Sequence, residues 1–105
     1  MDDFQIIFCT CPDFDTAKSI AEAIIRGNKA ACVNILPGIT SVYQWKNEIE
    51  TAQEHLLLIK TRQDHYQEIE LLIKQMHPYE LPEIISVPIG NGLPEYLNWI
   101  NQCVS

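Results

Sequence analysis

The central third of the chain constrains the fold most, because residues 30–61 have the pattern of two long strands joined by one tight turn. Residues 30–45 alternate apolar and polar side chains, with a break at Pro37-Gly38, and residues 49–61 carry a continuous apolar run in their second half, as paired strands do. A strand of about 16 residues spans about 50 Å, whereas a compact domain of this size is about 33 Å across. The hairpin is therefore predicted to extend beyond its own domain.

The projecting end of this hairpin carries the apolar and aromatic side chains Val42, Tyr43, Trp45 and Ile49. Such a set is unfavourable in water unless another surface covers it. We therefore expect a homo-oligomer whose subunits join through their hairpins.

Shorter elements flank the hairpin on both sides, and each has its own signals. Asp13 is suited to cap a helix and Gly27 to end it, while Pro94 is suited to the first position of a closing helix. The expected segments are a strand at 4–10, a helix from Asp13 to Gly27, a helix that begins at Thr61 and ends near Met76, a strand at 84–89 and the closing helix. The order β-α-β-β-α-β plus a C-terminal helix predicts the α+β class, as a ferredoxin-like sheet with both main helices on one face.

The composition describes one acidic domain that spans residues 1–105. The formal net charge of -7 argues against nucleic acid or an anionic membrane surface as the main partner, whereas cations remain suitable ligands. The sequence shows no apolar run long enough to cross a membrane and no signal-peptide pattern. We therefore expect a cytoplasmic protein whose four cysteines stay reduced.

Two prolines hold a histidine in extended backbone where the second main helix ends. Pro78 disfavours the helical conformation at His77, and Pro82 has the same effect on the residue before it. A histidine fixed in this way is suited to be a ligand, a proton donor or a hinge, depending on its neighbours.

Soft metal-ligand types surround this histidine in the predicted topology. Cys9 and Cys11 lie at the end of the first strand, Cys32 lies at the start of the second, and Met76 directly precedes His77. Thiolate, thioether and imidazole ligands suit copper and, less selectively, zinc. The same residues also have structural explanations, as small core residues, helix packing and a helix-end hydrogen-bond donor. A Cys–His nucleophile pair needs an oxyanion site as well, which the sequence does not indicate, so we expect a binding protein and no enzyme.

Several blocks of the sequence resemble the CutA divalent-cation tolerance proteins almost from end to end. The resemblance implies a ferredoxin-like subunit in a homotrimer built by long hairpins. It also implies that the protein binds copper and other divalent metals in connection with metal tolerance. The blocks are Cys9-Thr10 with Pro12-Asp13, residues 29–45, Ile59-Lys60-Thr61, His77-Pro78-Tyr79 with Pro82-Glu83, and Tyr96-Leu97 with Trp99.

The metal residues implied by this resemblance fall on Cys9 and His77, with Cys32 as a further candidate. Some members of the family have His-His-Pro-Tyr, whereas this chain has Met76 in the first position. A thioether in place of an imidazole favours Cu(I) over Cu(II), so Met76 joins the predicted ligands. Cys11 falls at a position that the motif does not specify.

A second functional class stays open. PII-like regulators share this fold and trimeric form, and by analogy the chain would be a signalling or scaffold trimer that binds a small ligand in clefts between subunits. Tyr43, Trp45, Lys60 and Tyr79 would then line the cleft.

Overall fold

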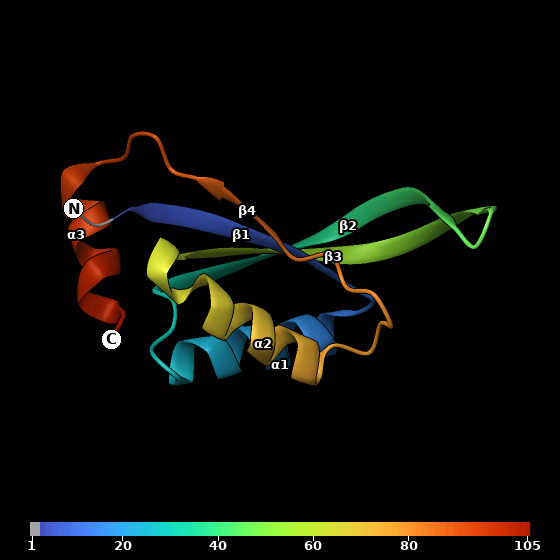
Figure 1. Ribbon diagram of the computed structural model, residues 1–105, viewed down its shortest axis with the longest axis horizontal. Coiled ribbons are helices and arrows are strands. Elements are labelled where there is room, and N and C mark those ends of the chain that lie inside the picture. The colour runs from blue at the N-terminus through green and yellow to red at the C-terminus, as the bar shows by residue number, and fades with distance from the viewer. Residues whose placement is uncertain (1–2) are drawn as a thin grey trace.

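The computed structural model describes residues 3–105 as a four-stranded antiparallel sheet with two helices on one face and a third helix near one end (Figure 1). The strand order β2-β3-β1-β4 inserts β3 between β1 and β2, which is the split βαβ arrangement of the ferredoxin-like fold. The predicted fold class is therefore confirmed. The elements are β1 (Phe4–Cys11), α1 (Phe14–Arg26), β2 (Cys32–Trp45), β3 (Glu48–Arg62), α2 (Tyr66–Met76), β4 (Ile85–Pro88) and α3 (Pro94–Cys103).

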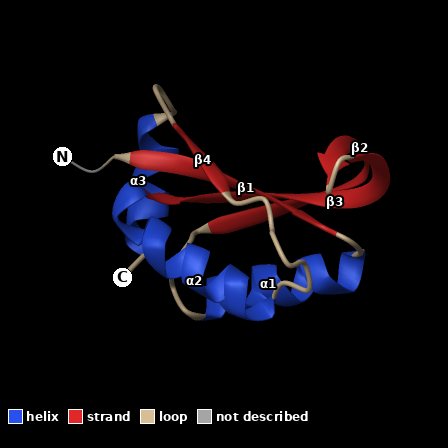
Figure 2. Cartoon of the chain, turned by 45° about the vertical axis from the view of Figure 1, so that its right-hand side comes forward, coloured by secondary structure: helices blue, strands red, loops and turns tan. Residues whose placement is uncertain are grey.

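The core lies between the sheet and helices α1 and α2, which cover one face together (Figure 2). Successive side chains of a strand point to opposite faces, so alternate residues of β1 reach this core. Two of the β1 residues that are fully buried there are cysteines. The buried set includes Ile7, Cys9 and Cys11 of β1, Leu57 and Ile59 of β3, Ile20 and Ile24 of α1, and Ile69 and Ile73 of α2.

The local signals for helix ends are confirmed. The Asp13 side chain accepts a hydrogen bond of 2.7 Å from the backbone N–H of Thr16, Gly27 follows α1 as its C-cap, and Pro94 is the first residue of α3.

Between residues 3 and 105, no helix is long and apolar enough to cross a membrane.

The β2–β3 hairpin projects beyond the two-layered body, as its length predicts (Figure 1). The molecule is 44 Å long and only 26 and 22 Å across in the other directions. Lys46 and Asn47 form the turn with φ angles of 51° and 67°, the left-handed pair that a type I′ hairpin turn requires. A register shift between Leu36 and Ile39, with Gly38 at φ 76°, confirms the predicted irregularity in β2.

The predicted start of the second main helix at Thr61 is wrong. Thr61 is a buried residue of β3, and α2 begins at Tyr66 after a single 3-10 turn at Gln63–His65. Pairing with β1 extends β3 to Arg62, which lies opposite Phe4. The strand pairing and a hydrogen bond of 2.6 Å from the Thr61 hydroxyl to the Lys29 carbonyl outweigh the helical pattern.

Thr61→Val should lower the free energy of unfolding by about 1–3 kcal/mol, because it leaves the Lys29 carbonyl without its donor. Urea unfolding at one fixed chain concentration measures the change. Ser19→Ala, which removes a hydroxyl from an exposed position of α1, is the control and should stay within about 0.5 kcal/mol. Equal effects of the two substitutions would contradict this account of Thr61.

Candidate metal centre and neighbouring pocket

Two thiols and one imidazole meet where β1 leaves the sheet. The ligand atoms of Cys9, Cys11 and His77 all lie within 4.8 Å of one another, and all three residues are buried. The cysteines are two residues apart on one strand, so both side chains point into the core. His77 follows the last residue of α2 and reaches the same place from the other side.

Backbone geometry holds His77 in position. Its φ and ψ of -78° and 135° are extended, as expected for a residue before proline. β4 pairs with β1 only from Gln5 to Phe8, and farther along β1 the Thr10 carbonyl lies 2.8 Å from His77 Nε2. The backbone N–H of Tyr79 lies 3.2 Å from His77 Nδ1. Because a carbonyl only accepts, Nε2 carries the proton, and Nδ1 accepts from Tyr79 as the unprotonated nitrogen of a neutral ring.

The two thiols differ in acidity. A hydrogen bond to Cys11, together with burial, raises the pKa of Cys9 far above its usual value. The same hydrogen bond lowers the pKa of Cys11. Cys11 is therefore the first of the pair to become a thiolate, which is the form that binds metals.

Sequence reasoning placed Cys9 and His77 together and left the role of Cys11 open. The alternation of side chains along a strand, which puts Cys11 on the same face as Cys9, was the available signal. Cys32 does not join the cluster within one chain. It pairs with Lys60, opposite Ile6, whereas Cys9 pairs with Leu57. That separation, two strands across and three residues along, is about 14 Å.

Met76 is the last residue of α2 and is 38% exposed, unlike the three buried groups. Its thioether adjoins His77 in sequence, and its part in metal binding stays a prediction.

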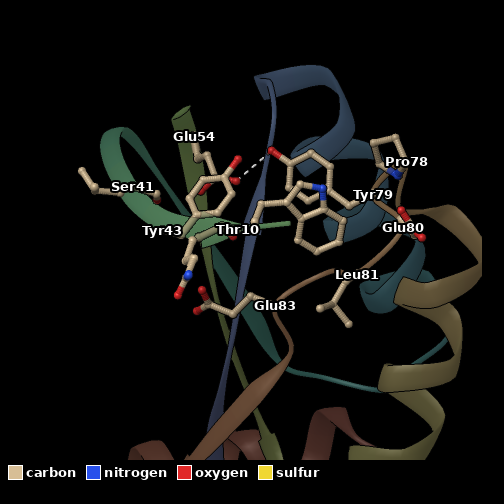
Figure 3. A pocket seen from close by; sticks show the side chains of 12 residues that line it. Thr10, Ser41, Tyr43, Glu54, Pro78, Tyr79, Glu80, Leu81 and Glu83 are labelled. Atoms are coloured by element: carbon tan, nitrogen blue, oxygen red, sulfur yellow. Dashed lines mark hydrogen bonds between the residues drawn. The ribbon is translucent and has the colours of Figure 1, made fainter. Parts of the chain in front are cut away.

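A pocket of about 750 Å³ includes Thr10 of β1 in its lining (Figure 3). Thr10 alternates with Cys9 and Cys11 along the strand, so the pocket lies on the other face of β1 from the two thiols. Tyr43, Trp45 and Tyr79 line it, as the sequence suggested for a small-ligand cleft. Lys60 lies elsewhere, with its ammonium 3.4 Å from the Tyr96 hydroxyl. Thr10 contacts both the thiol–imidazole cluster and the pocket, since its carbonyl accepts a hydrogen bond from His77 and the residue also lines the pocket.

Tyr79 connects the pocket to the cluster. Its ring centroid lies 4.7 Å from that of His77, and its hydroxyl donates a hydrogen bond of 2.8 Å to Glu54 Oε2 (Figure 3). Burial and this bond to a carboxylate raise the pKa of Tyr79 well above its usual value. The tyrosine therefore stays protonated and keeps donating to Glu54 at neutral pH.

Comparison with known proteins gives the family. Residues 5–103 match the model of the CutA1 divalent ion tolerance protein family. The chain belongs to this family. The divalent-cation tolerance protein CutA of Thermus thermophilus is 41% identical over 98 residues, which cover 93% of this chain and 95% of the relative. A longer mouse relative, Protein CutA, is 43% identical, and this chain spans 54% of its length.

Solved CutA structures agree with the fold. The crystal structure of CutA from Xylella fastidiosa has a TM-score of 0.95 and 46% identity, and the match covers 98% of this chain and 99% of that one. The periplasmic divalent cation tolerance protein CutA from Archaeoglobus fulgidus has a TM-score of 0.93 and 39% identity, with 100% of both chains covered. The resemblance to CutA seen in the sequence is confirmed.

Tyr79→Phe should destabilise this CutA-family chain by about 1–3 kcal/mol, because the buried Glu54 carboxylate loses its phenol donor. Tyr43→Phe, at the other tyrosine of the pocket, is the matched control and should change stability by less than about 0.5 kcal/mol. Denaturant unfolding of Tyr79→Phe, of Glu54→Gln and of the double variant measures the coupling between these two side chains. Tyr43→Phe is measured in the same way. Additive effects of Glu54→Gln and Tyr79→Phe would contradict a direct hydrogen bond between these two residues.

Proposed function

We propose that this chain binds a soft metal ion, copper as Cu(I), through Cys9, Cys11 and His77, and that this binding underlies a role in metal tolerance. The observation that supports it is the convergence of two thiols and one imidazole within 4.8 Å in a buried site. The names of its relatives as divalent-cation tolerance proteins support the biological role.

The donor set fits a soft ion. Thiolate sulfur selects Cu(I) and zinc over the hard cations that prefer oxygen. Ligands that share one metal at about 2.0–2.3 Å lie at most about 4.6 Å apart, so the three atoms need to draw together by only about 1 Å or less. Metal-ligating histidines usually donate a hydrogen bond from their other ring nitrogen. His77 Nε2 can keep donating to the Thr10 carbonyl while Nδ1, the unprotonated nitrogen, binds the ion in place of its contact with the Tyr79 N–H.

Binding is a better use of this site than catalysis. Cys9 and Cys11 are fully buried, and a nucleophilic cysteine must be reached by its substrate. The site also requires free thiols, and the structure has all four cysteines unpaired. Because thiols stay reduced in the cytosol, we propose a cytoplasmic location for this chain.

Cys9→Ser, Cys11→Ser and His77→Ala should each weaken Cu(I) affinity by about 100-fold or more, since even the loss of an outer hydrogen bond to a ligand costs about 10–100-fold. Competition titration against a Cu(I) chelator under reducing conditions gives the affinities. Cys103→Ser removes a thiol of α3 outside the cluster and is the matched control. Unchanged affinity in the three cluster variants, or an equal loss in the control, would overturn the proposal.

We also propose that the protein is a homotrimer joined through its β2–β3 hairpins. Val42 and Ile49 near the hairpin tip are 68% and 81% exposed in one chain. Exposed apolar side chains on a projecting hairpin favour a covering partner, and a second copy supplies a matching surface.

Light scattering at micromolar concentration should give three times the 12.0 kDa mass of one chain. Ile49→Asp should shift the protein toward smaller species, because it places a charge in the apolar contact. Leu71→Asp changes an exposed apolar side chain of α2 and should leave the mass unchanged. A monomeric wild-type protein would end the trimer proposal.

The pocket beside the metal centre supports a second candidate function, the binding of a small ligand as in a PII-like regulator. Three aromatic residues and a volume of about 750 Å³ are typical of small-molecule sites, which measure about 300–1,000 Å³.

A further inference from the structure

One buried ring nitrogen near the thiol cluster has no hydrogen-bond partner. The Nδ1 atom of His55 is shielded from solvent, and none of the described residues bonds to it. Buried polar atoms in folded proteins are nearly always paired, so an unpaired one calls for an explanation, such as a bound ion. Because Nδ1 makes no hydrogen bond, an ion that binds there displaces none.

The strand register places His55 next to the thiols. His55 of β3 pairs directly with Cys11 of β1, and opposite residues of an antiparallel pair have Cβ atoms about 4.5–5.5 Å apart on one face of the sheet. Cys9 pairs with Leu57 and is therefore the diagonal neighbour of His55, which an aromatic side chain can still reach. Leu57 is fully buried in the core, and His55, two residues away, shares its face.

The two imidazoles approach β1 from opposite sides. β1 lies between β3 and β4. The Phe4 carbonyl accepts from Ile89, just after β4, and carbonyls alternate in direction along a strand, so the Thr10 carbonyl also points to the β4 side. His77 bonds to that carbonyl, whereas His55 belongs to β3. The two thiols of β1 therefore lie between two histidines.

We propose that His55 is a fourth ligand of this cluster, which then binds a zinc ion through Cys9, Cys11, His55 and His77. Structural zinc sites are tetrahedral, and two cysteines with two histidines are one of their usual ligand sets. Two thiolates also balance the charge of Zn²⁺, whereas with Cu(I) they leave one negative charge in a buried site, where uncompensated charge is unfavourable. The inference rests on the proposed metal site and adds a fourth ligand and a divalent ion to it.

Rotation of one side chain brings His55 to the ion. It lies outside the group of atoms within 4.8 Å of one another. An ion about 2.3 Å from sulfur and about 2.1 Å from nitrogen joins ligand atoms at most about 4.4 Å apart, which directly opposite side chains can reach. The ring that packs against His55 is that of Phe14, with centroids 6.1 Å apart. Phe14 is 49% exposed, so this contact leaves the imidazole room to turn.

Metal affinities of His55→Phe test the proposal, because this substitution keeps an aromatic ring and removes both ring nitrogens. Competition with a chelator under reducing conditions, on the protein in its native assembly, gives the affinities. Zn²⁺ affinity should fall by about 100-fold or more, as for the loss of a ligand. Cu(I) affinity should change by less than about tenfold, since Cu(I) depends mainly on the soft sulfur ligands. Phe14→Leu alters the packing on His55 and keeps the imidazole, so this control should leave Zn²⁺ affinity within about threefold.

Cobalt spectra give a second readout that reports the ligands themselves. Co²⁺ can replace Zn²⁺ in tetrahedral sites, and its visible absorption depends on the number and type of ligands. The wild-type protein should show the intense bands of four-coordinate Co²⁺ together with thiolate charge transfer. In His55→Phe the thiolate band should remain, and the other bands should shift because water replaces the imidazole.

The outcomes separate the fourth ligand from the proposed metal site. Unchanged Zn²⁺ affinity and an unchanged Co²⁺ spectrum in His55→Phe, or a wild-type protein that binds Cu(I) and no Zn²⁺, would overturn the role of His55 and leave the three-ligand site in place. Equal losses of Zn²⁺ affinity in His55→Phe and Phe14→Leu would reveal a packing effect and overturn that role as well. Unchanged affinities for both ions in Cys9→Ser, Cys11→Ser and His77→Ala would overturn both proposals.

Discussion

The hydrogen bond from His77 Nε2 to the Thr10 carbonyl, 2.8 Å long, is the interaction on which the functional end of the molecule depends. It attaches the end of α2 to β1 at the point where β4 no longer pairs with that strand. A strand edge that leaves a carbonyl unpaired is costly in the interior, and His77 supplies the donor. In doing so it brings an imidazole to the two buried thiols of β1 and starts the connector that carries Tyr79 to the opposite face.

Local sequence rules predicted most of this architecture. The prolines after His77 and before Glu83 indicated extended backbone, and the length of residues 30–61 indicated the projecting hairpin. The family blocks then placed Cys9 beside His77. Prediction failed where long-range pairing decided the outcome. Thr61 has a helical sequence context, yet its contacts with Lys29 and the pairing of β3 with β1 keep it in a strand.

The candidate site was predictable only in part, for a related reason. Cys32 has the right chemistry, but the sheet register places it two strands from Cys9, and a register cannot be read from residue type. Cys11 could have been added from the alternation of side chains along β1. The bond between Tyr79 and Glu54 joins residues 25 positions apart, so only the folded structure shows that the pocket and the thiol cluster share a wall.

The central claim is that Cys9, Cys11 and His77 hold one soft metal ion. A crystal structure of the reduced protein grown with Cu(I), with the metal located by anomalous scattering, tests it most directly. The account predicts one copper bound by the sulfur atoms of Cys9 and Cys11 and by a ring nitrogen of His77. Copper bound only elsewhere, with the hydrogen bond between His77 and Thr10 and that between Tyr79 and His77 both intact, would contradict it.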